Sequence, residues 1–257
     1  MGCAFTRHKP TRKTPFGLVP AAAPRAPGRP LALIAVAAAL ALPAACAPPP
    51  TAGTAHATAE PARYLAAHYL DPAQVARVSR FRSGAGYDFS DDAESCRSMK
   101  HYLVPRAGLR AEDLILRAPA DGRIDALDPE WAGTKVTLAP IAAPDERIVL
   151  FHVAVRPGLA VGQRVSAGDV LGHHATLATW SDVALELRAG GGYRLGSIFE
   201  RLPDALWADW QARGIASRSQ LIIPRAERDA HPLACQRRHG PFAVPDGPGD
   251  WVVLEGS

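Results

Sequence analysis

Two short stretches carry most of the information about the fold: GYDFSD at residues 86–91 and SDVALELR at residues 181–188. Residues 182–187 alternate small or polar side chains with large apolar ones, which predicts a strand with one buried face. Residues two positions apart on a strand point to the same side. Asp182, Ala184 and Glu186 should therefore share one face, which carries two carboxylates and a methyl group.

Further segments show the same short apolar or alternating pattern. They are residues 123–127, 134–138 and 147–153, and residues of the turn-forming types Gly, Pro and Asp separate them. Several strands of this length and spacing predict a mainly β fold, an antiparallel β-sandwich or barrel.

One or two peripheral helices should accompany the strands. Residues 203–213 predict a helix, with Pro203 in the first turn and Gly214 just past the end. A second helix is expected over residues 61–68, leading into the domain.

Together these segments resemble the M23 family of zinc peptidases, the lysostaphin and LytM type. In that family the first stretch reads His-x-x-x-Asp and the second reads His-x-His. The resemblance covers about residues 79–195 and includes APADGRI at 118–124 and LFHV at 150–153. It implies a LytM-like β domain at residues 76–235, followed by a C-terminal tail at residues 236–257.

The resemblance also assigns roles to single residues. In M23 enzymes two histidines and one aspartate hold a zinc ion, which activates a water for attack on a peptide bond, and two further histidines assist. This chain has Tyr87, Asp91 and Ala184 at the three ligand positions. Of the catalytic histidines only His152 remains, and Asp182 replaces the other. A methyl group cannot ligate zinc, so we expect a vestigial site without a metal.

These substitutions predict a catalytically inactive cell-envelope domain that binds peptidoglycan or regulates a cell-wall hydrolase. The alternative is an active zinc metalloendopeptidase that cleaves peptidoglycan peptides through a rearranged site. In such a site His101, His173 or His174 would join the remaining carboxylates, or the carboxylates would hold a harder ion such as Ca²⁺ or Mg²⁺. An envelope protein with only a structural role is a third possibility.

Residues 1–45 have the layout of a secretory signal peptide, with six Lys or Arg, no acid and an apolar run at 31–42. That run is too short to span a bilayer comfortably, so a retained membrane anchor is the weaker alternative. Without this segment the chain has 23 Lys and Arg against 25 Asp and Glu. The basic pI near 9.0 therefore reflects the targeting segment and does not support a nucleic-acid partner.

The cysteines fit an exported protein. Cys46 follows LPAA at residues 42–45, which resembles the lipobox of bacterial lipoproteins and implies a lipid anchor in a membrane; a cleaved soluble protein is the alternative. Residues 46–75 would then form a tether, rich in Pro, Ala and Thr. Cys96 and Cys235 remain, and an even pair in an exported chain favours a disulfide over free thiols. We expect the protein in the periplasm or cell envelope.

Overall fold

The computed structural model describes residues 62–256 except 189 and 191. The predicted signal peptide, the lipidation site Cys46 and the first part of the tether lie outside the described residues. Within the described range, no helix combines the length and the hydropathy that a membrane span requires.

The described chain is mainly antiparallel β, as predicted, and every pairing between its strands is antiparallel. The four strands expected from the sequence are found in β4, β5, β6 and β9. The strands of the described residues are β1 (Val75–Ser79), β2 (His101–Pro105), β3 (Ile115–Arg117), β4 (Gly122–Pro129), β5 (Thr134–Pro140), β6 (Glu146–Val155), β7 (Arg164–Val165), β8 (Val170–His174), β9 (Ser181–Leu187), β10 (Arg194–Gly196) and β11 (Trp251–Val253).

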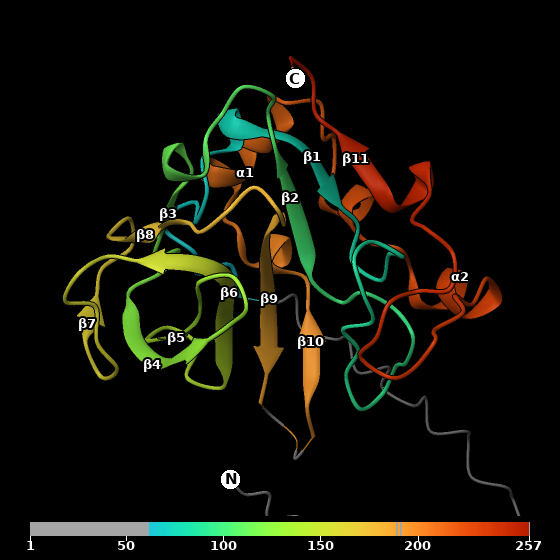
Figure 1. Ribbon diagram of the computed structural model, residues 1–257, viewed down its shortest axis with the longest axis horizontal. Helices are drawn as coiled ribbons and strands as arrows, with labels where there is room; N and C mark the ends of the chain where they lie inside the picture. The colour runs from blue at the N-terminus through green and yellow to red at the C-terminus, as the bar shows by residue number, and fades with distance from the viewer. Residues whose placement is uncertain (1–61, 189, 191, 257) are drawn as a thin grey trace, which may run out of the picture. The chain divides into compact units, whose positions relative to one another are not determined.

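The strands form one strongly curled sheet that is not closed (Figure 1). The order along the main path is β11-β1-β2-β9-β6-β5-β4-β7, with β10 paired to β9, β8 to β6 and β3 to β8. The long strand β6 changes its pairing partner along its length: its first half pairs with β9 and its last residues pair with β8.

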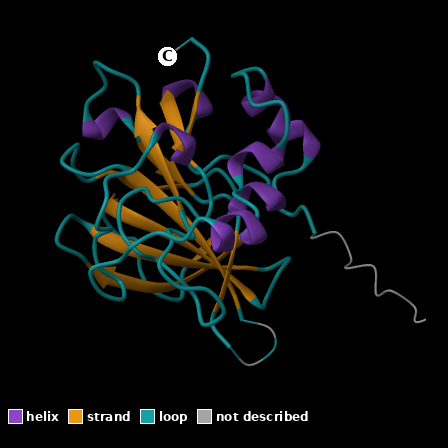
Figure 2. Ribbon diagram, turned by 90° about the vertical axis from the view of Figure 1, so that its right-hand side faces the viewer, coloured by secondary structure: helices purple, strands orange, loops and turns teal. Residues whose placement is uncertain are grey.

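Two short α-helices, α1 (Asp204–Gln211) and α2 (Arg225–Ala230), accompany the sheet. Helix α1 confirms the helix predicted over residues 203–213, and it buries Trp207 and Trp210. Helix α2 was not expected. The 3-10 turns are η1 (Pro72–Gln74), η2 (Ala111–Asp113), η3 (Ile198–Arg201), η4 (Arg218–Leu221) and η5 (Pro248–Asp250). Several of the helical turns lie together at the right of the strands in Figure 2, and others lie at the top and upper left.

The helix expected over residues 61–68 is wrong, because residues 62–68 contain no helix. The backbone N–H groups of Leu65, Ala66 and Ala67 donate to the carbonyl oxygens of Arg201 and Pro119. These partners lie far away in the sequence and replace the local bonds that a helix would form.

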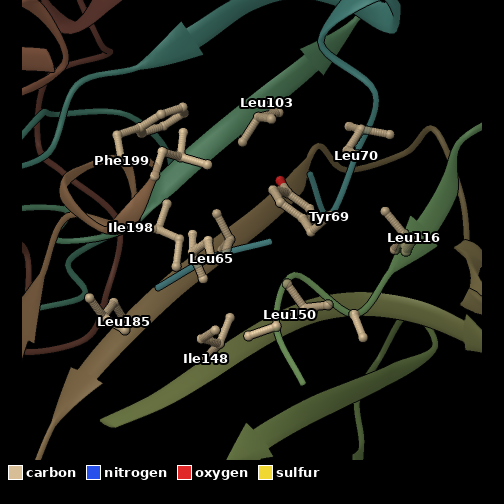
Figure 3. Packing of buried hydrophobic residues seen from close by; sticks show 14 of the residues in the cluster. Leu65, Tyr69, Leu70, Leu103, Leu116, Ile148, Leu150, Leu185, Ile198 and Phe199 are labelled. Carbon is tan, nitrogen blue, oxygen red and sulfur yellow. The ribbon is translucent and has the colours of Figure 1, made fainter. Parts of the chain in front are cut away.

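The folded domain is longer than the 76–235 range expected from the sequence. Leu65, Tyr69 and Leu70 belong to the expected tether but are buried in the main core (Figure 3). At the other end, Trp251 begins strand β11, which pairs with β1, so the last part of the expected tail is docked. Apolar side chains near both ends are buried, and this stabilises their attachment to the domain.

Side chains from β2, β6 and β9 alternate between two layers. Leu103, Ile148, Leu150, Val183 and Leu185 face the main core, which the helical turns cover. The intervening positions face a smaller apolar cluster on the other side of the sheet. Its buried members are Phe81, Met99, Val149, Phe151, Ala184 and Leu195.

Candidate functional site

The two stretches GYDFSD and SDVALELR meet at Lys100, a residue that the sequence did not single out. Lys100 directly precedes β2 and its side chain is fully buried. Its Nζ donates a hydrogen bond to Tyr87 Oη at 2.9 Å and forms an ion pair with the Asp182 carboxylate. Aromatic ring centroids surround the ammonium at 4.1 Å (Phe151), 4.4 Å (Tyr87), 4.8 Å (Tyr102) and 5.0 Å (Phe89). We call these six residues the Lys100 cluster.

The Lys100 cluster keeps its lysine charged. Burial lowers the pKa of Lys100, because removing an ammonium from water costs several kcal/mol. The Asp182 carboxylate and, to a smaller extent, the oxygens of Tyr102 and Tyr87 outweigh burial, so the pKa of Lys100 lies above its ordinary value. The electron-rich ring faces stabilise the cation further. Lys100 and Asp182 therefore form an ion pair that is sealed from solvent at neutral pH.

The residues at the predicted metal positions do not fit a zinc ion. Ala184 packs against Val149, Phe151 and Met99 in the smaller apolar cluster, and its methyl group has no lone pair to donate. The Tyr87 oxygen already accepts a hydrogen bond from an ammonium, whose charge would repel a metal ion. Among the described residues, no group of three or more His, Cys, Asp or Glu side chains is placed to hold a metal.

The third predicted ligand position, Asp91, binds backbone groups instead. Its Oδ1 accepts hydrogen bonds from the N–H groups of Ala93 at 2.8 Å and Glu94 at 3.0 Å. Its Oδ2 accepts from the N–H of Leu195 in β10 at 3.0 Å. Both oxygens of Asp91 thus shape the turn that follows GYDFSD and fasten it to β10, with partners outside the Lys100 cluster.

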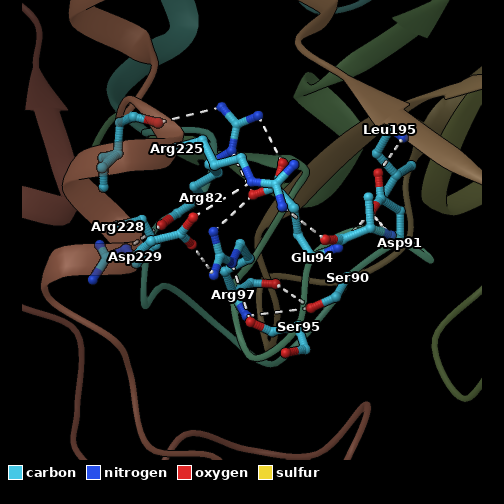
Figure 4. A network of polar contacts seen from close by, with 12 residues as sticks. Arg82, Ser90, Asp91, Glu94, Ser95, Arg97, Leu195, Arg225, Arg228 and Asp229 are labelled. Atoms are coloured by element: carbon cyan, nitrogen blue, oxygen red, sulfur yellow. Dashed lines mark hydrogen bonds and ion pairs between the residues drawn. The ribbon is translucent and has the colours of Figure 1, made fainter. Parts of the chain in front are cut away.

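A disulfide holds the loop that follows Tyr87, together with a polar network around Arg97, Glu94 and Arg82 (Figure 4). Cys96 and Cys235 are bonded across 139 residues, as predicted. Next to the bridge, Arg97 pairs with Glu94 at 2.7 Å. Closing so long a loop stabilises the fold by about 5 kcal/mol on the chain-entropy model. These restraints fix the position of Tyr87 relative to the sheet.

The backbone at His152 is unusual, with a left-handed φ of +58°. The residue lies at a bulge in β6, between the last pair with β9 (Leu150 with Val183) and the first pair with β8 (Val153 with His174). A non-glycine residue in this conformation costs about 1 kcal/mol or more, and such strain concentrates at functional sites. The bulge thus marks His152 as a candidate functional residue.

The contacts of His152 join it to Asp182, so the structure brings together the two positions assigned to catalytic histidines. Its Nδ1 donates to the Ala132 carbonyl oxygen at 3.1 Å, and Glu130 Oε2 accepts from the His152 backbone N–H at 3.1 Å. Its Nε2 lies 3.6 Å from Asp182 Oδ1, which is too long for a hydrogen bond. Asp182 Oδ1 is buried and has no hydrogen-bond partner among the described residues.

A pocket of about 580 Å³ opens over His152. At its rim, the Trp131 side chain is 74% exposed and Leu177 is also exposed. The pocket is lined by Gly86, Tyr87, Tyr102, Glu130, Trp131, His152, Leu177, Ala178, Thr179, Trp180 and His239. Sequence reasoning missed most of this lining. The available signal was Trp131, because a large aromatic residue in the short turn before Gly133 has no core to fill.

Of the three histidines considered for a rebuilt metal site, His101 and His173 are used elsewhere, whereas His174 has its ring centroid 6.4 Å from that of His152 and a buried Nδ1 without a hydrogen-bond partner among the described residues. His101 faces the main core, where Nδ1 donates to Ser79 O at 2.8 Å and Nε2 accepts from Ser197 Oγ at 2.8 Å. His174 and His173 donate to backbone carbonyl oxygens at 3.1 and 2.9 Å. Among the described residues, these histidines do not join two further His, Cys, Asp or Glu side chains in a group that could hold a metal.

Comparison with known proteins gives only partial likenesses. No family model matches the chain, and no curated protein matches it. A putative glycyl-glycine endopeptidase LytM from Ruminococcus gnavus is 14% identical over 39% of this chain and 44% of that chain, with a TM-score of 0.33. Csd3 from Helicobacter pylori is 15% identical over 55% and 35%, with a TM-score of 0.39.

The catalytic domain of the antimicrobial peptidase lysostaphin from Staphylococcus simulans is 14% identical over 35% of this chain and 68% of that domain, with a TM-score of 0.27. The chain thus spans less than half the length of the LytM and Csd3 chains that it matches. These likenesses concern parts of the fold and leave the chemistry of this chain to its own residues.

Proposed function

We propose that this protein is an exported cell-envelope component whose M23-like domain binds peptidoglycan stem peptides without cutting them. The observation that carries the proposal is the buried ammonium of Lys100. It is bonded to Tyr87 and Asp182, two positions at which the M23 motifs carry histidines. A fixed internal cation at these positions supports a domain that works without a metal.

Hydrolysis would need groups that this pocket does not offer. Metal-dependent cleavage uses an ion that activates water and polarises the carbonyl, and the donor set here does not fit one. The Lys100 ammonium cannot replace that ion, because it is sealed from solvent and cannot reach a substrate. In the part of the chain that the structure describes, no serine, threonine or cysteine side chain is hydrogen-bonded to His152, as nucleophilic catalysis would require.

The shape and lining of the pocket are, by contrast, suited to binding a peptide. The pocket over His152 has the volume of a small-molecule or peptide site, with a few polar groups set among aromatic walls. Trp131 and Leu177 expose apolar surface at its rim, which is typical of ligand-contacting positions.

Export and anchoring belong to the same proposal. Residues 1–45 would direct secretion, and Cys46 would carry the lipid that holds the domain at a membrane. The disulfide between Cys96 and Cys235 suits an oxidising compartment such as the periplasm. The tether is shorter than expected, because the domain begins to pack at Leu65.

Co-sedimentation with purified peptidoglycan tests the proposal. The wild-type protein should sediment with the polymer, and Trp131→Ala should weaken binding by roughly tenfold through loss of apolar contact. Ile141→Ala is the matched control, since Ile141 is exposed but does not line the pocket; it should bind normally.

Absence of the wild-type protein from the pellet would contradict peptidoglycan binding. If the protein did not bind peptidoglycan but stimulated a purified cell-wall hydrolase, a regulatory role would replace peptidoglycan binding as the proposed function. Chelator-sensitive release of peptides from the polymer would establish the alternative, an active zinc endopeptidase.

A further inference from the structure

The charges that line the pocket over His152 favour a positive ligand. Of the lining residues, only Glu130 carries a carboxylate and none is a lysine or arginine. The Glu130 side chain is 19% exposed, and within residues 62–256 its one ion-pair contact is His152 Nδ1 at 3.4 Å. The Lys100 charge beneath the pocket is balanced by Asp182. Glu130 is thus left to attract a cation.

The aromatic walls add a second attraction for a cation, because ring faces carry negative charge density. Trp180 is held edge-on by Tyr102 at 5.6 Å and by Trp251 at 5.1 Å between ring centroids. Trp131 meets the His152 ring at 5.5 Å and leaves most of its own surface open to a ligand. Trp180 is already held by its neighbours, so it loses little conformational freedom on binding.

Oxygen acceptors also surround the His152 ring at the base of the pocket. They are the Ala132 carbonyl, the Glu130 carboxylate and Asp182 Oδ1. Asp182 Oδ1 is buried and accepts no hydrogen bond from any residue that the structure describes. Asp182 is fully buried and does not line the pocket, so of these acceptors only Glu130 can contact a ligand directly.

The protein already binds one ammonium with the same chemistry. In the Lys100 cluster a carboxylate and four ring faces hold a primary amine in its charged form. The pocket repeats this combination on the exposed side of Tyr87 and Tyr102, which contact Lys100 and also line the pocket. There Glu130 corresponds to Asp182 and Trp131 supplies an open ring face, whereas the Trp180 ring already lies 5.8 Å from the Arg77 guanidinium.

We propose that the pocket binds a protonated primary amine, held by the Glu130 carboxylate and the face of Trp131. This inference rests on the proposed function: the amine is the free side-chain amino group of the diamino acid in a peptidoglycan stem peptide. Recognition of that amine selects stem peptides that have not served as the acceptor in a cross-link, because acylation converts the acceptor's amine to an uncharged amide.

Calorimetric titration of the full exported protein with two synthetic peptides tests the inference. One is the pentapeptide L-Ala-γ-D-Glu-L-Lys-D-Ala-D-Ala, and the other carries an acetyl group on the lysine Nε. We expect the free amine to bind at least about tenfold more tightly, as a charge-assisted contact predicts. Glu130→Gln should reduce this preference to within about twofold, because it removes the charge and keeps an oxygen for the His152 N–H.

Asp128→Asn is the matched control, since Asp128 is an exposed carboxylate two residues away that pairs with Lys135 and does not line the pocket. It should retain the full preference. Equal binding of the two peptides would overturn the amine inference and leave the proposed function standing. If neither peptide bound, stem-peptide binding itself would be contradicted.

Discussion

Lys100 and His101 are neighbours in the chain and both are buried, yet at neutral pH Lys100 is charged and His101 is neutral. Lys100 faces the smaller apolar cluster and is held charged by Asp182. His101 faces the main core, where burial lowers the pKa of His101 to about 4 and only neutral partners, Ser79 O and Ser197 Oγ, contact its ring nitrogens. Burial penalises both charged forms, so the difference lies in the partner.

Strand geometry explains why the two environments are so different. His101 begins β2 and faces the main core, whereas Lys100 directly precedes the strand and points to the other face, so the main core and the candidate site are separated by one strand thickness. The layer that packs the domain contains a neutral histidine. The layer on the other side contains the Lys100 ammonium and its counter-ion, Asp182.

The largest expected effect comes from removing the partner that makes the two residues differ. Asp182→Ala leaves the Lys100 ammonium buried without a counter-ion, and we expect the free energy of unfolding to fall by about 3 to 5 kcal/mol. Urea denaturation with the disulfide intact measures it. The double substitution Lys100→Met with Asp182→Leu removes both charges and should be within about 1 kcal/mol of wild type. A loss below 1 kcal/mol for Asp182→Ala would show that the pair is not sealed.

A smaller effect should appear at His101 as a pH dependence. The folded-state pKa of His101 is about 4, below its ordinary value of 6.5, so the unfolded chain binds more protons between these limits. The stability that this difference provides is present above about pH 6.5 and is lost as the pH falls through about 4, by roughly 3 kcal/mol in total.

Urea denaturation at several pH values measures that loss. His101→Gln keeps a donor and an acceptor but does not titrate, so its stability should depend less on pH in this window. Parallel pH profiles for wild type and variant would contradict the assignment.

The smallest effect is expected at the Tyr87 hydroxyl. Tyr87→Phe removes one acceptor from the Lys100 ammonium but keeps the ring and the Asp182 partner, so we expect a loss of about 1 to 2 kcal/mol in unfolding free energy. Tyr193→Phe is the control, because the Tyr193 hydroxyl has no hydrogen-bond partner among the described residues and should cost less. If Tyr87→Phe were as stable as wild type, the hydroxyl would have no part in holding the cation.

The repetitive part of the fold could be predicted from the sequence. The strands in β4, β5, β6 and β9 follow from alternation, and α1 follows from its apolar face and flanking residues. The chain ends could not be placed in this way. The apolar residues of 62–70 indicate burial, but they do not say whether the segment lies extended on its partners or coils into a helix.

Some residues of the candidate site could be predicted from the sequence, and Lys100 could not. The motif positions directed attention to Tyr87, Asp182 and His152, which do lie around one centre. Lys100 was not found, because a lysine one residue before a strand is typical of a solvated position. Its role depends on Asp182, which is 82 residues away in the sequence and becomes a neighbour only through the pairing of β2 with β9.

Zinc content tests most simply whether the buried ammonium of Lys100 and its partners leave no site for a metal. The exported protein, with its disulfide intact, would be incubated with equimolar zinc and dialysed against a weak chelator, and the metal per chain would be measured. A zinc peptidase carried through the same steps is the control. We expect that no zinc remains on this protein. One tightly held zinc per folded chain would contradict this expectation and favour the alternative, an active zinc peptidase.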